Sequence, residues 1–379
     1  MLIKLDYSKR ISILFTLLSC ILAILIPMFT VTVIVNNYSL PPSLLPFYQW
    51  HGFQMIFCFF ITIYIGYIIS ISDKRNKDKL YASILFILWI NEQIAIHMYA
   101  NKLLLMLSSG ILSLTVLYYS YLSFDEKLNR TFFCITSFIF LGLKSVYLFS
   151  AISKSTFNLK NEVLILSIWI LILTSSTIIK KTHLGLTLNL IKSSNKSLLG
   201  RVLFFLSLIF LLLIPTTLLV KNKHYFFMVY FCAGLFNLQY LRNIKAKELS
   251  KRPTLSIIGL SYFVMFSSLI VNSFSLYFQS FSYTKATLHL SLTGGVTLFA
   301  FYYMIMIIDR SSFNVEKKNK SILFMCMCIF IGFLIRVIVP IYDLNLFNKS
   351  LHYSMGMWTL AFLVFFIKYL PIAFKKRIN

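Results

Sequence analysis

The chain has 379 residues, of which 59% are hydrophobic and 12% are charged. Soluble globular domains contain about 25% charged residues, so this composition excludes a soluble globular protein. Lys and Arg number 36 against 11 Asp and Glu, which gives a formal net charge of +25 at pH 7. The apolar residues form continuous runs rather than an alternating pattern, which favours transmembrane helices. We therefore predict an all-α, polytopic integral membrane protein with the lipid bilayer as its surroundings.

Twelve apolar runs follow one another along the chain. A helix needs roughly 20 apolar residues to cross about 30 Å of hydrocarbon. The runs lie at residues 12–35, 51–72, 80–99, 103–122, 132–152, 163–179, 202–220, 224–240, 254–276, 286–308, 321–341 and 351–372. The first is too long for a cleaved signal peptide and is expected to remain as the first helix. Residues 1–379 are predicted to form a single transmembrane helical domain with about twelve helices.

The positions of Lys and Arg predict the orientation of these helices. With the N-terminus in the cytoplasm, 26 of the 36 basic residues fall in cytoplasmic stretches and seven in the opposite loops. Cytoplasmic loops carry an excess of Lys and Arg, so both termini are predicted to be cytoplasmic. The basic residues are divided among short loops instead of gathering on one face, which argues against nucleic-acid binding.

Five of the six histidines fall at the predicted outer ends of the apolar runs, namely His51, His97, His224, His289 and His352. Three of them, His97, His224 and His352, lie close to a tyrosine in the sequence, a pattern typical of the membrane interface. The other two are candidate metal or haem ligands, because imidazole commonly binds both. Met55 follows His51 at i+4, so the two side chains project on one helix face and suit copper or haem iron. Gly294 and Gly295 follow His289 and predict close backbone approach.

Three charged residues lie inside the apolar runs: Glu92, Lys144 and Arg336. At a helical rise of about 1.5 Å per residue, Glu92 and Lys144 both lie roughly 18 Å from the cytoplasmic start of their runs, and Arg336 lies roughly 22 Å from its own. Charges inside a bilayer are usually paired or functional. One alternative is a structural ion pair between Glu92 and Lys144. The other is an outer polar cavity, in which one cation neutralises Glu92 and the second is free for an anionic group such as a haem propionate.

Four segments of the chain together resemble the NnrS family of bacterial membrane proteins, which are tied to nitric oxide stress. In chain order they are the run from Trp50 to Met55, similar to W-H-x-H-E-M; Arg252-Pro253 followed by Tyr262; His289 with Gly294, similar to H-A-L-T-x-G; and residues 358–371, similar to W-x-L-A-F and [RK]-Y-x-P. They occur in the family's order across nearly the whole chain. The resemblance implies a multi-pass protein of the bacterial cytoplasmic (inner) membrane that binds haem, and copper as a further expectation, with nitric oxide as a possible small ligand.

The chain departs from the family pattern at several candidate ligands. Phe53 and Gln54 stand where the W-H-x-H-E-M segment has its second histidine and its glutamate. Tyr147 stands at the family's histidine in the fifth helix, Gly259 at the histidine before Tyr262, and residues 309–312 replace its G-H-T-G-R stretch.

The candidate ligands that remain, His51 and His289, could supply the two axial ligands of a haem. A ligating histidine normally donates its second ring nitrogen to an orienting group, for which Gln54 and Thr293 are candidates. Lys144 and Arg336 are the candidate partners of the haem propionates.

Three functions remain open. The first is haem or metal binding in nitric oxide defence. The second is secondary transport that uses the buried Glu92, Lys144 and Arg336. The third is a divergent family member without a cofactor. A haem-copper oxidase subunit is disfavoured, because that chemistry needs more histidines than the six scattered here.

Overall fold

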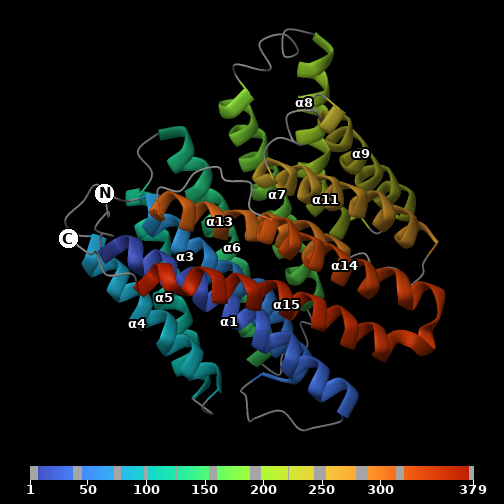
Figure 1. Cartoon of the computed structure of the whole chain (residues 1–379). Helices are drawn as coiled ribbons and strands as arrows, with labels where there is room; N and C mark the ends of the chain where they lie inside the picture. The colour runs from blue at the N-terminus through green and yellow to red at the C-terminus, as the bar shows by residue number, and fades with distance from the viewer. Residues whose placement is uncertain are drawn as a thin grey trace. The chain divides into compact units, whose positions relative to one another are not determined.

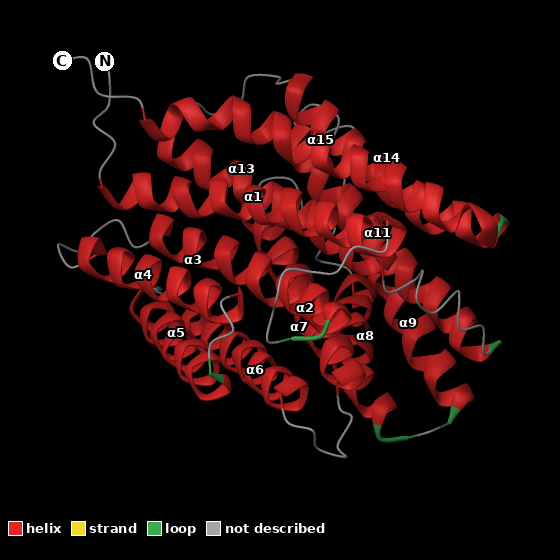
Figure 2. Ribbon diagram, turned by 90° about the horizontal axis from the view of Figure 1, so that it is seen from below, coloured by secondary structure: helices red, strands yellow, loops and turns green. Residues whose placement is uncertain are grey.

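The chain is described by a computed structural model that covers residues 7–36, 45–71, 78–97, 101–123, 127–152, 160–187, 198–220, 222–242, 253–278, 289–312 and 320–374. Every element in these ranges is helical (Figures 1 and 2), which confirms the all-α prediction for them. The chain divides into two compact units. Unit 1 comprises residues 1–167, 303–315 and 362–379, and unit 2 comprises residues 168–302 and 316–361. The single domain over residues 1–379 stays a prediction.

Unit 1 holds most of the N-terminal helices. They are α1 (Tyr7–Asn36), α2 (Phe47–Gly52), η1 (Phe53–Cys58), α3 (Phe59–Ile71), α4 (Asp78–His97), α5 (Lys102–Ser123), α6 (Lys127–Ile152) and the first part of α7 (Lys160–Thr187). The helices α2, η1 and α3 follow one another without a break, and η1 is π-helical. Single π-helical turns inside α-helices frequently occur at functional sites.

Unit 2 holds the remaining helices. They are the rest of α7, α8 (Leu198–Leu213), the 3₁₀ turn η2 (Ile214–Leu218), α9 (Lys223–Arg242), α11 (Pro253–Tyr277), the π-helical η3 (Leu290–Val296), α13 (Thr297–Ser312), α14 (Lys320–Tyr342), the 3₁₀ turn η4 (Leu344–Leu346) and α15 (Phe347–Phe374). Residues 303–312 of α13 and 362–374 of α15 belong to unit 1. In unit 1, α1 begins and α15 ends at the same end of the unit (Figures 1 and 2), as is required of two termini on one side of a membrane.

Nine helices of the described chain are long and apolar enough to cross a membrane. They match nine of the predicted runs within a few residues; for example, the run predicted at 132–152 corresponds to Arg130–Ile152. The runs at 163–179 and 202–220 correspond to shorter apolar helices, Glu162–Thr177 and Phe205–Leu218, and the run at 224–240 forms α9, which is not among the nine. The protein is therefore a multi-pass membrane protein, while the count of twelve spans and the cytoplasmic side of the termini stay predictions.

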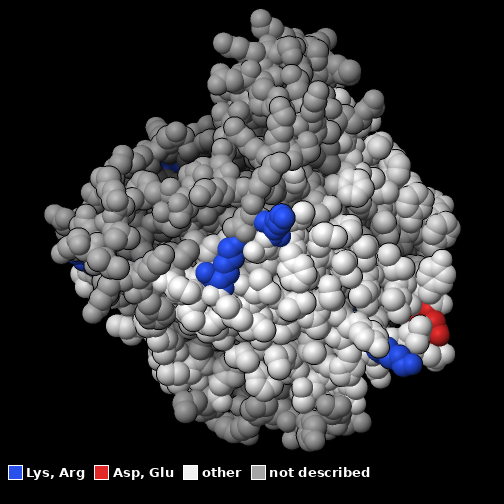
Figure 3. Space-filling model, viewed as in Figure 1, with Lys and Arg blue, Asp and Glu red and all other residues white. Residues whose placement is uncertain are grey.

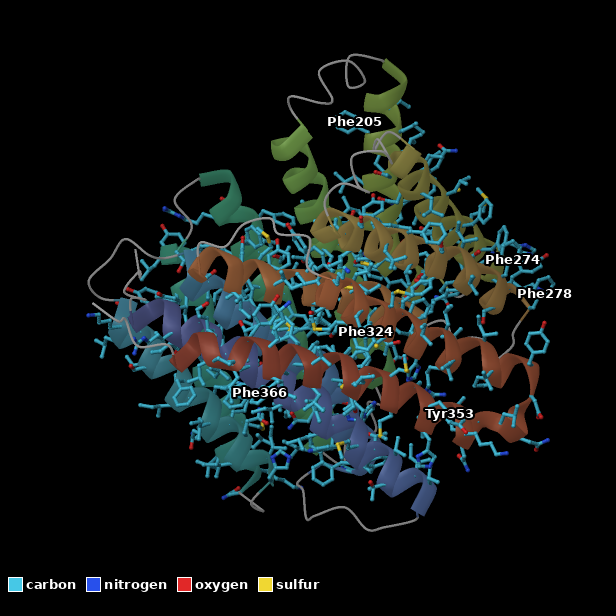
Figure 4. The ribbon with its side chains drawn as sticks, viewed as in Figure 1. Phe205, Phe274, Phe278, Phe324, Tyr353 and Phe366 are labelled. Carbon is cyan, nitrogen blue, oxygen red and sulfur yellow. The ribbon has the colours of Figure 1, made fainter. Side chains whose placement is uncertain are left out.

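Large apolar side chains on the outside of the helices suit a lipid environment. Phe205, Phe274, Phe278, Phe324 and Tyr353 are 43–72% exposed and point away from the ribbon (Figure 4). On the face drawn in Figure 3, the described surface is mostly uncharged, with isolated Lys and Arg side chains. A surface of this kind is costly in water but is the usual lipid-facing surface of a helix bundle.

Helix packing in unit 1 relies on small side chains and on bonds between hydroxyls and backbone. The Ser12 hydroxyl of α1 donates to the Gly66 carbonyl of α3 at 2.7 Å. The Trp89 indole of α4 donates to the Thr62 hydroxyl of α3 at 2.8 Å. These bonds hold α1 and α4 against α3, so the long helix α2–η1–α3 forms the centre of unit 1 and its residues are mostly buried.

Helix packing in unit 2 brings backbones very close together. A Cβ atom on Gly295 of η3 would lie 2.9 Å from the backbone of Met265 in α11, and one on Gly234 of α9 would lie 2.7 Å from the Phe266 carbonyl. Small residues at such crossings let membrane helices approach closely. The close backbone approach predicted for Gly294 and Gly295 is therefore confirmed for Gly295, whereas Gly294 lies against the Val264 and Phe333 side chains.

Candidate functional site

His51 lies near the start of the long central helix of unit 1, directly before the π-helical segment. Its Nδ1 atom is 2.8 Å from the Thr30 hydroxyl of α1. That hydroxyl donates its single proton to the Ile26 carbonyl at 2.7 Å, so it must accept from His51. Nδ1 therefore carries the imidazole proton and Nε2 carries the lone pair. A ring held in this way through its second nitrogen has the orientation and tautomer that a metal ligand needs.

Thr30, rather than the predicted Gln54, is the residue that orients His51. Gln54 instead donates from Nε2 to the Gln93 Oε1 atom of α4 at 3.2 Å. Thr30 is 21 residues away from His51 in the sequence. Met55, the predicted partner of His51, is 7% exposed and lies within the π-helical segment.

His97 links the end of α4 to the start of the same central helix. The Trp50 indole donates to His97 Nε2 at 3.0 Å, and His97 Nδ1 lies 2.8 Å from the Gln93 carbonyl, to which it donates. Both ring nitrogens are therefore occupied, which makes His97 a structural residue rather than a ligand. An interfacial histidine is expected from the sequence here, but the bond between His97 and the Trp50 indole is not.

Glu92 and Lys144 form the ion pair that was one of the two alternatives. Glu92 Oε1 of α4 and Lys144 Nζ of α6 are 2.5 Å apart, and the side chains are 1% and 0% exposed. The Lys144 ammonium also lies 5.9 Å from the centroid of the Phe53 ring. The Cys58 thiol lies within electrostatic range of both charges and beside Gln93. Lys144 is thus engaged with Glu92 and does not fit the expected role of a cation free for a propionate.

Phe53 and Tyr147, which the sequence resemblance places at two histidines of the family, are in contact in this structure. The Phe53 and Tyr147 rings are stacked, with centroids 6.3 Å apart, and both pack against Phe57. The Tyr147 hydroxyl donates to the Gln49 carbonyl at 3.1 Å. An aromatic cluster therefore occupies this part of unit 1. These substitutions are scattered in the sequence and gathered in space.

His289 belongs to unit 2 and directly precedes the second π-helical segment, η3. The Thr293 hydroxyl donates to the His289 carbonyl at 2.5 Å, and the Thr297 hydroxyl donates to the Leu292 carbonyl at 2.9 Å. Because His51 and His289 are in different units, the pairing of the two histidines on one haem stays a prediction.

Arg336 also belongs to unit 2. Its guanidinium lies 4.6 Å from the centroid of the Phe347 ring at the start of α15, and the side chain is half-buried. The structure thus brings together two of the three predicted buried charges, Glu92 and Lys144, in unit 1. The third, Arg336, lies against the Phe347 ring in unit 2.

Metal-binding geometry can be judged only over the described ranges. Those ranges contain no group of three or more His, Cys, Asp and Glu side chains that could hold a metal ion.

No curated protein matches the chain. A family model does match: the model described as NnrS protein covers residues 13–377, which is nearly the whole chain. The chain therefore belongs to the NnrS family.

Proposed function

We propose that this chain is a bacterial inner-membrane protein that contributes to nitric oxide resistance and binds haem through His51. The observation that carries the proposal is the bond between His51 Nδ1 and the Thr30 hydroxyl, which leaves the lone pair on Nε2. Membership of the NnrS family supports the link to nitric oxide stress. Haem, when bound, supplies an iron atom that can take nitric oxide as a ligand.

His289 and Arg336 are the candidate haem-binding residues of unit 2. His289 would be a ligand and Arg336 a cation for a propionate, since Lys144 is already paired with Glu92. Thr30 would hold the His51 ring in place. Copper is the weaker expectation, because Phe53 and Tyr147 stack where the family has histidines.

The absorption spectrum of protein purified from haem-replete membranes tests this proposal. We expect a Soret band that is lost in His51→Ala and weakened in Thr30→Val, which keeps the shape of Thr30 but cannot accept the hydrogen bond. His352→Ala is the matched control, because this exposed histidine lies at the same predicted side of the membrane. A colourless wild-type protein would contradict haem binding and favour a family member without a cofactor. A Soret band that His51→Ala leaves intact would contradict ligation of the haem by His51.

Secondary transport is the second candidate, and the buried Glu92–Lys144 pair favours it. Ionisable residues inside a membrane often lie on ion or proton pathways. In that case Glu92→Gln would abolish solute uptake or its proton coupling in vesicles while the protein still folds. Uptake that is unchanged in Glu92→Gln would exclude the pair from transport.

A further inference from the structure

Several buried polar atoms of unit 1 lack a hydrogen-bond partner within the described residues. They are Gln49 Oε1, Gln54 Oε1, Gln93 Nε2, Ser109 Oγ and Ser113 Oγ. They belong to α2, η1, α4 and α5. Few buried polar groups in native proteins stay unsatisfied, and ordered water usually supplies the missing partner. We therefore expect ordered water molecules among these four helices.

The Glu92–Lys144 pair lies in the same helix cluster. Its two side chains are 1% and 0% exposed. Removing each charge from water costs several kcal/mol, which the attraction between them offsets only when the remaining lone pairs and protons are hydrogen-bonded. The ammonium has three N–H donors and the carboxylate about four acceptor sites. A single contact between Lys144 and Glu92 leaves most of these unused.

The helix α5 provides polar groups on its buried face. Ser109 and Ser113 are one turn apart there, and both hydroxyls are buried without a partner. Because α5 packs against α4 and α6, which carry Glu92 and Lys144, its serines lie on a helix adjacent to the pair.

Polar groups of α4 connect the neighbourhood of the ion pair to the end of the helix. Glu92 is 1% exposed, the adjacent Gln93 is half-buried, and His97, the last residue of α4, is exposed. Gln93 is bonded to Gln54 through its side chain and to His97 through its carbonyl. Polar groups therefore lead from the residue beside Glu92 to the end of α4, which the sequence predicts to lie at the membrane surface.

We propose that unit 1 encloses a hydrated proton-exchange site between η1, α4, α5 and α6. Water molecules bridge the unpartnered amides and hydroxyls to the Glu92–Lys144 pair and connect it to bulk water at the end of α4. The Lys144 ammonium gives a proton to a bridging water and receives one from it, so the pair keeps its charges and nothing is oxidised or reduced. This site is independent of haem binding at His51.

Cys58 is a natural probe of this hydration. Its thiol is 1% exposed and lies beside Gln93 and within range of both charges. Cys20 on α1 is equally buried, at 0% exposed, but no charged group among the described residues acts on it. The S–H stretching band in the infrared is free of other protein bands and shifts when hydrogen is replaced by deuterium. Cys58 is therefore the probe of the hydrated region, and Cys20 is the matched control at a buried position away from it.

The experiment uses the full chain in lipid nanodiscs, with alanine at five of the six cysteines so that only Cys58 or only Cys20 remains. After transfer to D₂O, we expect the Cys58 thiol to exchange at least tenfold faster than the Cys20 thiol. Equal exchange rates, or slower exchange at Cys58, would overturn the proposal.

A second measurement avoids the cysteine variants. The infrared band of the Glu92 carboxylate is identified in the wild-type chain because it is absent from the Glu92→Gln variant, in which an uncharged amide replaces the carboxylate. We expect this band to shift within minutes of transfer to D₂O, because deuterated water and a deuterated Lys144 ammonium replace its partners. A Glu92 band that stays unchanged for hours would show a dry ion pair and overturn the proposal.

Discussion

The two π-helical segments have the same position after a histidine and very different surroundings. In unit 1, η1 follows His51 and lies among charged, amide and aromatic side chains, several with unpartnered atoms. In unit 2, η3 follows His289, and its Gly295 lies against the backbone of α11. The Ser261 hydroxyl donates to the Gly295 carbonyl, and Ser268 bonds to Ser291. The same helical feature thus supports a polar site in one unit and close helix packing in the other.

The largest expected effect is the loss of one partner of the ion pair beside η1. Lys144→Met leaves Glu92 as an uncompensated buried charge, so we expect the protein to lose about 3–5 kcal/mol of stability. The double variant Glu92→Leu/Lys144→Met should recover much of this loss. Thermal unfolding of the purified protein measures both. Lys79→Met, at an exposed position of α4, is the control, and equal unfolding of Lys144→Met and this control would contradict the structural role of the pair.

The next effect tests the packing of η3. In Gly295→Ala the new methyl group would lie 2.9 Å from the Met265 backbone, which cannot move without shifting α11. We expect a loss of about 1–3 kcal/mol, as for other overpacked sites. Gly356→Ala is the matched control in unit 2, because a Cβ there meets nothing within 4 Å. If both variants unfold alike, η3 is not packed as closely as described.

A smaller effect concerns the aromatic stack beside η1. Tyr147→Phe keeps the ring on Phe53 but loses the bond to the Gln49 carbonyl, which should cost about 0.5–1.5 kcal/mol. Tyr147→Leu removes the stack as well and should cost more. Chemical denaturation of the two variants separates the bond from the ring contact, and equal losses would mean that the stack adds nothing.

The smallest effect belongs to η3. Hydrogen bonds between membrane helices contribute about 0.6 kcal/mol on average, so the Ser268–Ser291 bond should show a coupling of that size. A double-mutant cycle with Ser268→Ala and Ser291→Ala measures it. A coupling near zero would indicate that the glycine contacts alone hold η3 against α11.

The helices themselves could be predicted from the sequence because a bilayer imposes a length and a composition on each span. The equal depths of Glu92 and Lys144 along their helices also allowed an ion pair to be predicted, and the structure contains it. The alternatives for Lys144 could not be separated in the sequence, since that requires knowing which helices are neighbours.

The detail of the site could not be predicted, because it depends on contacts between distant segments. Nothing in the sequence connects Thr30 with His51, or Phe53 with Tyr147, 94 positions further along. The π-helical winding of residues 53–58 and 290–296 was also missed, because both runs have ordinary helical composition. Tertiary packing decides each of these features.

Growth under nitric oxide tests the central claim most directly. A strain that lacks this protein is complemented with the wild-type chain, with His51→Ala or with His352→Ala, at matched protein levels, and exposed to a nitric oxide donor. We predict that the wild-type chain and His352→Ala restore growth and that His51→Ala does not. Full restoration of growth by His51→Ala would contradict the proposal that His51 carries the function.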